Sequence, residues 1–207
     1  YKKFSPGPIT YILNLKSDSK ISKNVTNKKY NLAVRFPKHK ILRKLLNRLD
    51  YPLAAPSANI STRLSAVQAS DVKDDFGNKI VYVLDGGKCN IGLESTIIDL
   101  RGSPKILRLG GLEVSKINKI LGKKIKISTN PQKKIAPGQS RLHYSPGIPL
   151  RMNVKKPKEK EAFILLKKSR NTYSNYFYLS KKNDLREAAK NLYSLLRKIK
   201  NEKYRSI

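Results

Sequence analysis

Short apolar runs, most of them ended by Pro, Gly or a polar residue, recur along this 207-residue chain and limit what it can fold into. Runs this short are typical of strands, because a buried helix needs a longer periodic stretch. We expect strands or extended segments at residues 11–15, 31–35, 52–56, 80–84, 95–100 and 106–108. Apolar residues at helical spacing predict helices at residues 39–49 and 113–121. Ser65 is a candidate N-cap, so we expect a short helix near residues 66–69 or 71–75. Strands alternating with helices indicate an α/β fold with a mixed sheet.

The composition changes between residues 128 and 149, where Pro and Gly punctuate a polar run without periodicity. This stretch is typical of a long linker. Beyond it, we expect strands at residues 162–166 and 176–179 and a long helix with Asp184 as its acidic N-cap. The predicted domains are therefore 1–127, a linker at 128–149 and 150–207. Two strands and one helix make a small domain, so we expect the chain to lack part of this domain.

The chain carries 45 Lys and Arg against 14 Asp and Glu, a net charge of +31 that attracts polyanions. The basic residues are scattered in pairs, and no repeat of aromatic and basic residues indicates an RNA-recognition motif. A single cysteine excludes a disulfide scaffold, and no Cys/His cluster indicates a zinc site. No apolar run approaches the roughly 20 residues that span a bilayer. Charge alone therefore does not decide the function.

Two kinds of segment carry groups suited to an anionic ligand. The loop 56–59, Pro-Ser-Ala-Asn, offers a hydroxyl, a carboxamide and backbone N–H groups without adding negative charge. Arg35 and Arg108 each end an apolar strand, where a buried guanidinium needs a carboxylate or phosphate partner. Ordinary turns and exposed arginines use the same residue types, so both interpretations stay open on these patterns alone.

The histidines, the cysteine and the missing nucleotide-binding motifs argue against several common kinds of active site. His39 and His143 are the only histidines, and neither lies in a pattern typical of a Ser–His–Asp triad. Cys89 follows a Gly-Gly turn, and nothing near it would activate a thiol. The chain has neither the Gly-Lys phosphate loop nor the Gly-x-Gly-x-x-Gly fingerprint, so a nucleotide site must be of a less common type.

Six segments, in this order and spacing, resemble YrdC-type domains. They are Phe4–Thr10, Leu32–Pro37, Ala55–Asn59, Asp85–Gly87, Gly92–Thr96 and Ile106–Gly111. The stretch from Pro137-Gly138 to His143-Tyr144-Ser145-Pro146 and the α/β segment after it are similar to the long, two-domain family of threonylcarbamoyl-AMP synthases. The resemblance implies a YrdC-like twisted mixed sheet with helices, followed by a linker and part of a small Rossmann-like α/β domain.

The resemblance also implies a reaction. Such enzymes join L-threonine, bicarbonate and ATP, with Mg²⁺ on the phosphates, and form threonylcarbamoyl-AMP and pyrophosphate. A threonylcarbamoyl-transferase complex then modifies an adenosine of tRNA. A nucleotidyltransferase of this kind needs no covalent nucleophile, which agrees with the absence of a triad motif. We expect a cytoplasmic location and no membrane association.

Matched to the family motifs, Arg35 and Ser95 would bind L-threonine. The residues that would contact ATP are Asn31, Ala55, Ser57, Asn59, Ser65, Arg108 and Tyr144. Two departures stand out. Ser5 occupies a position where the family usually has Trp, and the family's N-terminal Lys-x-Arg and Thr-Val-Tyr-Gly segments are not in this sequence. We therefore expect this stretch of chain by itself to be inactive.

Two rival functions fit the same features. One is a YrdC-type module that binds double-stranded RNA or assists ribosome maturation without synthase activity, with the positive charge as its basis. The other is a carbamoyl-transferring enzyme of the hydrogenase-maturation type. The linker and the α/β segment after it argue against the second, because they belong to the two-domain synthases.

Overall fold

The structure is a computed structural model that describes residues 1–129, 143–170, 173–202 and 204–207. The chain forms two compact units, each made from two stretches of sequence. The sheet unit comprises Tyr1–Pro56 and Glu94–Arg141, and the helix unit comprises Ser57–Leu93 and Leu142–Ile207. The domain boundaries expected from the sequence stay a prediction, and Pro137-Gly138 of the expected linker lies outside the described residues.

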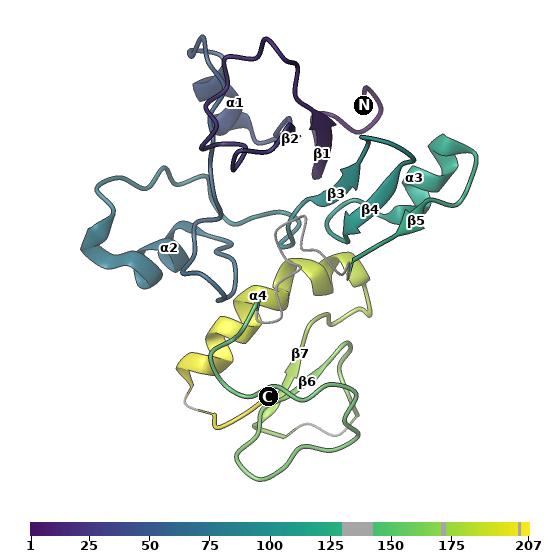
Figure 1. Cartoon of the computed structure of the whole chain (residues 1–207). Helices are drawn as coiled ribbons and strands as arrows, with labels where there is room; N and C mark the ends of the chain where they lie inside the picture. The colour runs from purple at the N-terminus through teal and green to yellow at the C-terminus, as the bar shows by residue number, and fades with distance from the viewer. Residues whose placement is uncertain (130–142, 171–172, 203) are drawn as a thin grey trace. The chain divides into compact units, whose positions relative to one another are not determined.

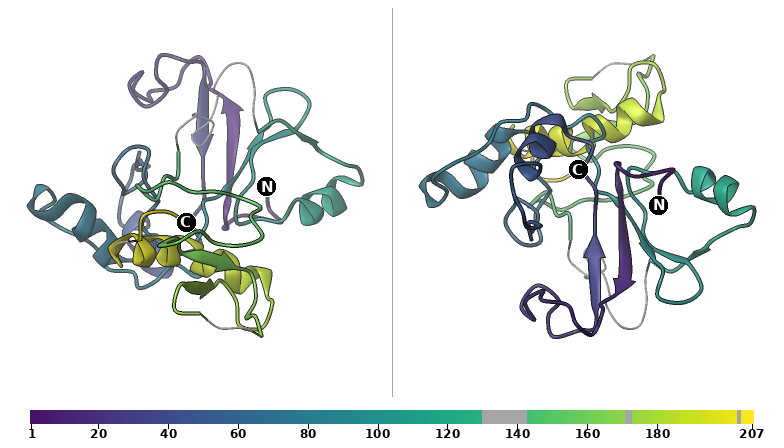
Figure 2. Two further views of the ribbon diagram at one scale, coloured as in Figure 1. Left: turned by 90° about the horizontal axis from the view of Figure 1, so that it is seen from below. Right: turned by 90° about the horizontal axis from the view of Figure 1, so that it is seen from above.

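A five-stranded mixed sheet forms the sheet unit, in the order β2-β1-β3-β4-β5. Its strands are β1 (Ile9–Asn14), β2 (Asn31–Val34), β3 (Thr96–Asp99), β4 (Lys105–Arg108) and β5 (Lys126–Ile127). β1 pairs antiparallel with β2 and parallel with β3, while β3 pairs antiparallel with β4 and β4 parallel with β5. Figures 1 and 2 show β1 and β2 side by side. The predicted mixed α/β fold is confirmed.

Alternating side chains place apolar residues on both faces of this sheet, as the two-residue period of a strand requires. One face carries Ile9, Tyr11, Ile98 and Ile106, which pack with Ile117 of α3 (Val114–Leu121). The other face carries Ile12, Ile97 and Leu107. The helix α3 is followed by its C-cap Gly122, whose φ of 65° is left-handed. The helix α1 (Lys40–Leu46) also forms where its apolar stripe predicts it, although none of its residues is buried.

The helix unit is organised around α4 (Leu185–Asn201), which begins after its N-cap Asp184 as expected. Asp184 Oδ1 accepts hydrogen bonds from the backbone N–H groups of Arg186 and Glu187. This unit also contains α2 (Ala69–Phe76), the 3₁₀ turn Gly77–Lys79, and the parallel pair β6 (Phe163–Leu165) and β7 (Tyr176–Tyr178). Its buried apolar core is formed by Leu64, Val67, Ala162, Tyr193, Leu196, Ile199 and Ile207. Figure 2 shows α4 alongside the β6–β7 pair.

The strand predicted at residues 80–84 does not form, and residues 52–56, expected as a strand or an extended segment, are not part of a strand. Residues 80–84 lie outside any strand, with Val81 85% and Tyr82 89% exposed. Residues 52–56 are also irregular and exposed. An apolar run becomes a strand only where a neighbouring strand supplies backbone hydrogen-bond partners, and the described residues place no strand beside either segment. Sequence periodicity does not report on that partner.

Across the described part of the chain, no helix combines the length and the apolar character needed to cross a membrane.

Candidate functional site

A polar cluster surrounds Ser95, the residue immediately before β3, which is only 4% exposed. The Ser95 hydroxyl lies 2.6 Å from the Thr10 hydroxyl of β1 and accepts a 3.1 Å hydrogen bond from Arg108 Nη2. Arg108 Nε donates a second hydrogen bond, of 3.0 Å, to the Ser95 carbonyl. The structure therefore brings together Ser95 and Arg108, which the sequence predicts as site residues. Sequence reasoning missed Thr10, although it lies in the first of the six motifs.

Close backbone packing fixes the position of Ser95. A Cβ added to Gly110 would lie 2.6 Å from the Ser95 carbonyl carbon, so only glycine fits there. The next residue, Thr96, is fully buried and exchanges two hydrogen bonds with the backbone of Leu112. The sequence motif contains Gly110, but its spacing alone does not reveal this steric role.

The sheet register sets the position of Arg35, which directly follows β2 and is exposed. Tyr11 pairs with Val34 at the last printed step of the antiparallel β1–β2 ladder, and Thr10 precedes Tyr11 on β1. Arg35 therefore leaves β2 at the end of the ladder that is nearest Thr10. Asn31 pairs with Asn14 at the other end of β2 and does not join the cluster, and Ala55 lies in the irregular segment 51–56.

The other predicted residues belong to the helix unit, where Ser57, Asn59 and Ser65 lie in an irregular loop before α2. The Asn59 side-chain amide donates to the carbonyls of Ile60, at 2.9 Å, and Arg63, at 3.2 Å. These two bonds fix the orientation of the carboxamide. Its oxygen, Oδ1, is buried and accepts no hydrogen bond from the described part of the protein. Asn59 thus both builds the turn and presents an acceptor.

Tyr144, the last predicted ATP contact, is held against α4. Its ring stacks on that of Tyr193, with centroids 5.8 Å apart and planes 21° from parallel. Its backbone φ is 58°, a left-handed value that is uncommon for a residue with a side chain. The next residue, Ser145, donates its backbone N–H to the Thr62 carbonyl at 2.9 Å. The segment around Tyr144 therefore packs beside the loop that contains Asn59.

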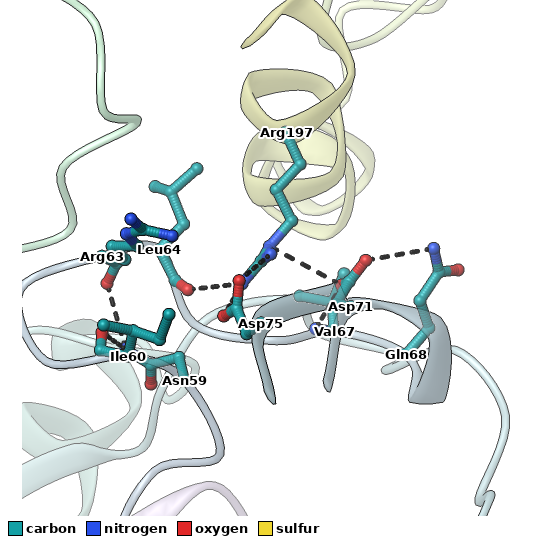
Figure 3. A network of polar contacts seen from close by, with 9 residues as sticks. All are labelled: Asn59, Ile60, Arg63, Leu64, Val67, Gln68, Asp71, Asp75 and Arg197. Atoms are coloured by element: carbon teal, nitrogen blue, oxygen red, sulfur yellow. Dashed lines mark hydrogen bonds and ion pairs between the residues drawn. The ribbon is translucent and has the colours of Figure 1, made fainter. Parts of the chain in front are cut away.

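Arg197 of α4 binds the same loop, and sequence reasoning missed it because its apolar neighbours define only a buried helix face. Figure 3 shows its contacts. Arg197 Nη2 donates to the Leu64 carbonyl at 2.7 Å, and the guanidinium binds both carboxylate oxygens of Asp75 of α2, at 3.1 and 2.9 Å. Hydrogen bonding to Arg197 lowers the pKa of the Asp75 carboxyl, and Asp75 in turn raises the pKa of Arg197.

Each unit contains a hollow among its described residues. One, of about 390 Å³, is lined by residues of β1, β2 and the segment after β1. The other, of about 610 Å³, lies in the helix unit beside Asp71, Asp75 and Arg197. Neither is lined by a residue predicted to bind substrate. The predicted residues are divided between the two units, so neither unit by itself contains the complete set.

No group of three or more His, Cys, Asp or Glu side chains suited to a metal ion occurs among the described residues. In the helix unit, Asp75 is paired with Arg197. Mg²⁺, which prefers oxygen ligands such as those of phosphate groups, stays an expectation from the sequence.

The mixed sheet and the motifs described above match a known family. Residues 1–110 match the family model Sua5/YciO/YrdC, described as telomere recombination, and the chain belongs to this family. Residues 112–207 match the model of the C-terminal domain of threonylcarbamoyl-AMP synthase. The resemblance drawn from the sequence is confirmed.

Three similar proteins are each named threonylcarbamoyl-AMP synthase. The protein from Pyrococcus abyssi is 42% identical over 70% of this chain and 44% of its own length. The Schizosaccharomyces pombe protein is 39% identical over 70% of this chain and 38% of its own length. The Bacillus subtilis protein is 36% identical over 72% of this chain and 44% of its own length. The matched region thus spans about two fifths of these relatives.

Two solved structures share the fold. Sua5 from P. abyssi, complexed with L-threonine, has a TM-score of 0.84 and 32% identity, with 100% of this chain and 65% of that chain covered. A variant of P. abyssi Sua5, in which a histidine and a tyrosine are replaced by alanine, has a TM-score of 0.78 and 31% identity, with 100% of this chain and 64% of that chain covered.

Proposed function

We propose that this protein makes L-threonylcarbamoyl-AMP and pyrophosphate from L-threonine, bicarbonate and ATP. The observation that carries the proposal is the Ser95 cluster, a preorganised set of a buried serine, a threonine and an arginine, on a chain of the Sua5/YciO/YrdC family. One structural neighbour of the whole chain is a Sua5 complexed with L-threonine, which supports an amino acid as one ligand.

The Ser95 cluster suits the amino acid. A guanidinium binds a carboxylate with two parallel hydrogen bonds, and Arg35, which leaves β2 at the end of the ladder nearest Thr10, supplies one for the threonine carboxylate. Ser95 then faces the rest of the threonine, held in place by its contacts with Thr10 and Arg108. Arg108 uses two N–H groups on Ser95, which leaves others of its five donors for an anion such as a phosphate.

The loop that contains Ser57, Asn59 and Ser65 suits the nucleotide, together with Tyr144. Asn59 Oδ1 is a buried acceptor that a hydroxyl or amino group of ATP would satisfy. The hydroxyls of Ser57 and Ser65 and the loop N–H groups donate to phosphate oxygens without opposing charge. The ring of Tyr144 is fixed by stacking and covers a base or ribose without further loss of entropy. Asn31 and Ala55 stay predicted contacts of ATP.

The chemistry needs positioning rather than a nucleophilic side chain. The amine of threonine and bicarbonate condense to a carbamate with loss of water. A carbamate oxygen attacks the α-phosphorus of ATP, a mixed anhydride forms and pyrophosphate leaves. Holding both substrates and offsetting the negative charge supply the rate enhancement. We propose that Mg²⁺ accompanies ATP, and that a threonylcarbamoyl-transferase complex acting on tRNA in the cytoplasm consumes the product.

Pyrophosphate release by the protein as its gene encodes it tests the proposal. We expect pyrophosphate release to require both threonine and bicarbonate. The Arg35→Ala variant should release pyrophosphate more slowly than the unchanged protein at a low threonine concentration. Serine in place of threonine is a matched substrate control, since it lacks only the methyl group. ATP hydrolysis that is independent of threonine would contradict the synthase function.

The alternative, an RNA-binding module, is supported by the net charge of +31 alone. Binding of double-stranded RNA that weakens steeply with salt, in a protein without threonine-dependent pyrophosphate release, would favour that alternative.

A further inference from the structure

The loop from Ser57 to Val67 lies outside the helices and strands, apart from an isolated bridge between Arg63 and Ser145, so few backbone bonds hold it in place. Within the loop, Asn59 bonds two carbonyls, and the Arg63 N–H donates to the Ile60 carbonyl at 3.1 Å. These local bonds shape the turn. A backbone bond from the Ser145 N–H to the Thr62 carbonyl joins the middle of the loop to the segment of Tyr144. At the C-terminal end of the loop, side chains attach it to α2 and α4.

Arg197 makes the polar side-chain contacts that join this C-terminal end of the loop to α4. It is only 16% exposed, and its guanidinium binds the Leu64 carbonyl and Asp75 at the same time. Its Nε also lies 3.9 Å from Asp71, whose carboxylate accepts the Val67 N–H at 2.8 Å. One arginine side chain therefore joins α4, the end of the loop and α2, as Figure 3 shows. Such bidentate geometry orders the groups it bridges, because the guanidinium fork is rigid.

Apolar contacts also pack α4 against both segments that are predicted to contact ATP, the loop and Tyr144. Leu64 and Val67 of the loop are buried in one core with Leu196 and Ile199 of α4. One turn earlier on α4, Tyr193 stacks on Tyr144. A shift of the loop relative to α4 would therefore change the spacing between Asn59 and Tyr144.

We propose that Arg197 is a positioning residue for ATP: it holds the Ser57–Ser65 loop at a fixed spacing from Tyr144, so that both are ordered before the nucleotide binds. This inference rests on the proposed function, in which these segments contact ATP. Arg197 touches no reacting atom, and its effect is transmitted through the Leu64 carbonyl and Asp75. Preorganisation of this kind raises affinity because binding no longer has to order the loop.

The test compares Arg197→Lys with the unchanged protein, each expressed as its gene encodes it. Lysine keeps the charge but cannot bridge the Asp75 carboxylate and the Leu64 carbonyl. We expect the KM for ATP to rise roughly tenfold, the factor that corresponds to losing one or two of the hydrogen bonds that hold the loop. The kcat and the KM for threonine should stay within about twofold, because the Ser95 cluster belongs to the sheet unit.

Two further variants separate positioning from a loss of stability. Arg151→Lys is the matched control, since Arg151 forms an equally bidentate pair with buried Glu161 in the same unit, away from the loop. It should lower the Tm and leave the KM for ATP unchanged. Asp75→Asn should raise the KM for ATP as Arg197→Lys does, and the double variant should stay near tenfold rather than a hundredfold, because the two residues act as one unit.

Calorimetric binding of Mg²⁺-ATP without threonine distinguishes this inference from the proposed function. If the unchanged protein releases no threonine-dependent pyrophosphate but binds ATP, the proposed function fails, and the ATP affinities still decide the role of Arg197. An Arg197→Lys variant with unchanged ATP affinity, or one in which both KM values rise equally, would overturn the positioning role. Absence of ATP binding in the unchanged protein would overturn both.

Discussion

The Ser95 cluster and the Ser57–Ser65 loop are both candidate binding elements, yet they are held in place in opposite ways. Backbone packing holds Ser95, which lies at the start of a buried strand against Gly110 and β1. Side chains hold the C-terminal end of the loop, above all Arg197, which contacts Leu64 from 133 residues away in the sequence. We therefore expect the position of Ser95 to tolerate the loss of a side chain but not an added Cβ at Gly110. The position of the loop should depend on the side chains that hold it.

The largest expected effect tests the backbone packing. Gly110→Ala adds a Cβ against backbone atoms that cannot move aside, so we expect a loss of about 3 kcal/mol in the free energy of unfolding. Urea denaturation measures it. Gly102→Ala is the control, because a Cβ at Gly102 meets nothing within 4 Å. Equal stability of the two variants would show that backbone packing does not fix Ser95.

Acid should weaken the helix unit through Glu161. Hydrogen bonding to Arg151 lowers the pKa of the Glu161 carboxyl from 4.5 to about 2. The unfolded chain therefore binds more protons than the folded chain between these values, and the folded state loses stability as the pH falls from about 4.5 to about 2.

We expect this loss to reach about 2 kcal/mol, a figure reduced from the full shift because Arg151 is partly exposed. Glu161→Gln should remove that part of the pH dependence, which urea midpoints at a series of pH values would detect. Asp99 of the sheet unit, whose pKa is also lowered by its own arginine neighbour, keeps its contribution in this variant. A pH profile identical in both proteins would contradict this assignment.

A side-chain deletion in the Ser95 cluster should affect threonine more than ATP. Ser95→Ala removes the hydroxyl that contacts Thr10 and Arg108, and leaves the backbone packing unchanged. We expect the KM for threonine to rise roughly tenfold, since one hydrogen bond to a charged donor is lost. Steady-state pyrophosphate release measures it, with exposed Ser103→Ala as control. A larger effect on ATP than on threonine would reassign Ser95 to the nucleotide.

The smallest expected effect concerns a local contact of the sheet unit. The Asn118 side chain of α3 accepts a 2.8 Å hydrogen bond from the Ile125 N–H and so fixes the chain after the helix. Asn118→Ala should cost about 1 kcal/mol in the free energy of unfolding. Exposed Lys119→Ala on the same helix should cost nothing measurable. Hydrogen exchange at Ile125 would show whether the loss is confined to this segment.

The family of this chain could be predicted from its sequence alone. The motif order predicts the family, and the matches over residues 1–110 and 112–207 confirm it. The substrate roles of Arg35 and Ser95 and of the seven predicted ATP contacts stay predictions.

Local sequence patterns by themselves determined those helices and strands that depend on residues close together in the sequence. The short apolar runs of β1 and β4, the helical stripes of α1 and α3, and the N-cap Asp184 all form as predicted. Each depends on interactions between residues a few positions apart, and a periodic pattern records such interactions directly.

Tertiary structure alone decided the rest. Residues 80–84 have the apolar pattern of a strand but lie outside the sheet, because a strand also needs a neighbour. Thr10 joins Ser95 across 85 residues, and Arg197 reaches Asp75 across 122. No local pattern encodes such pairs, because hydrogen-bond geometry exists only after distant segments have packed together.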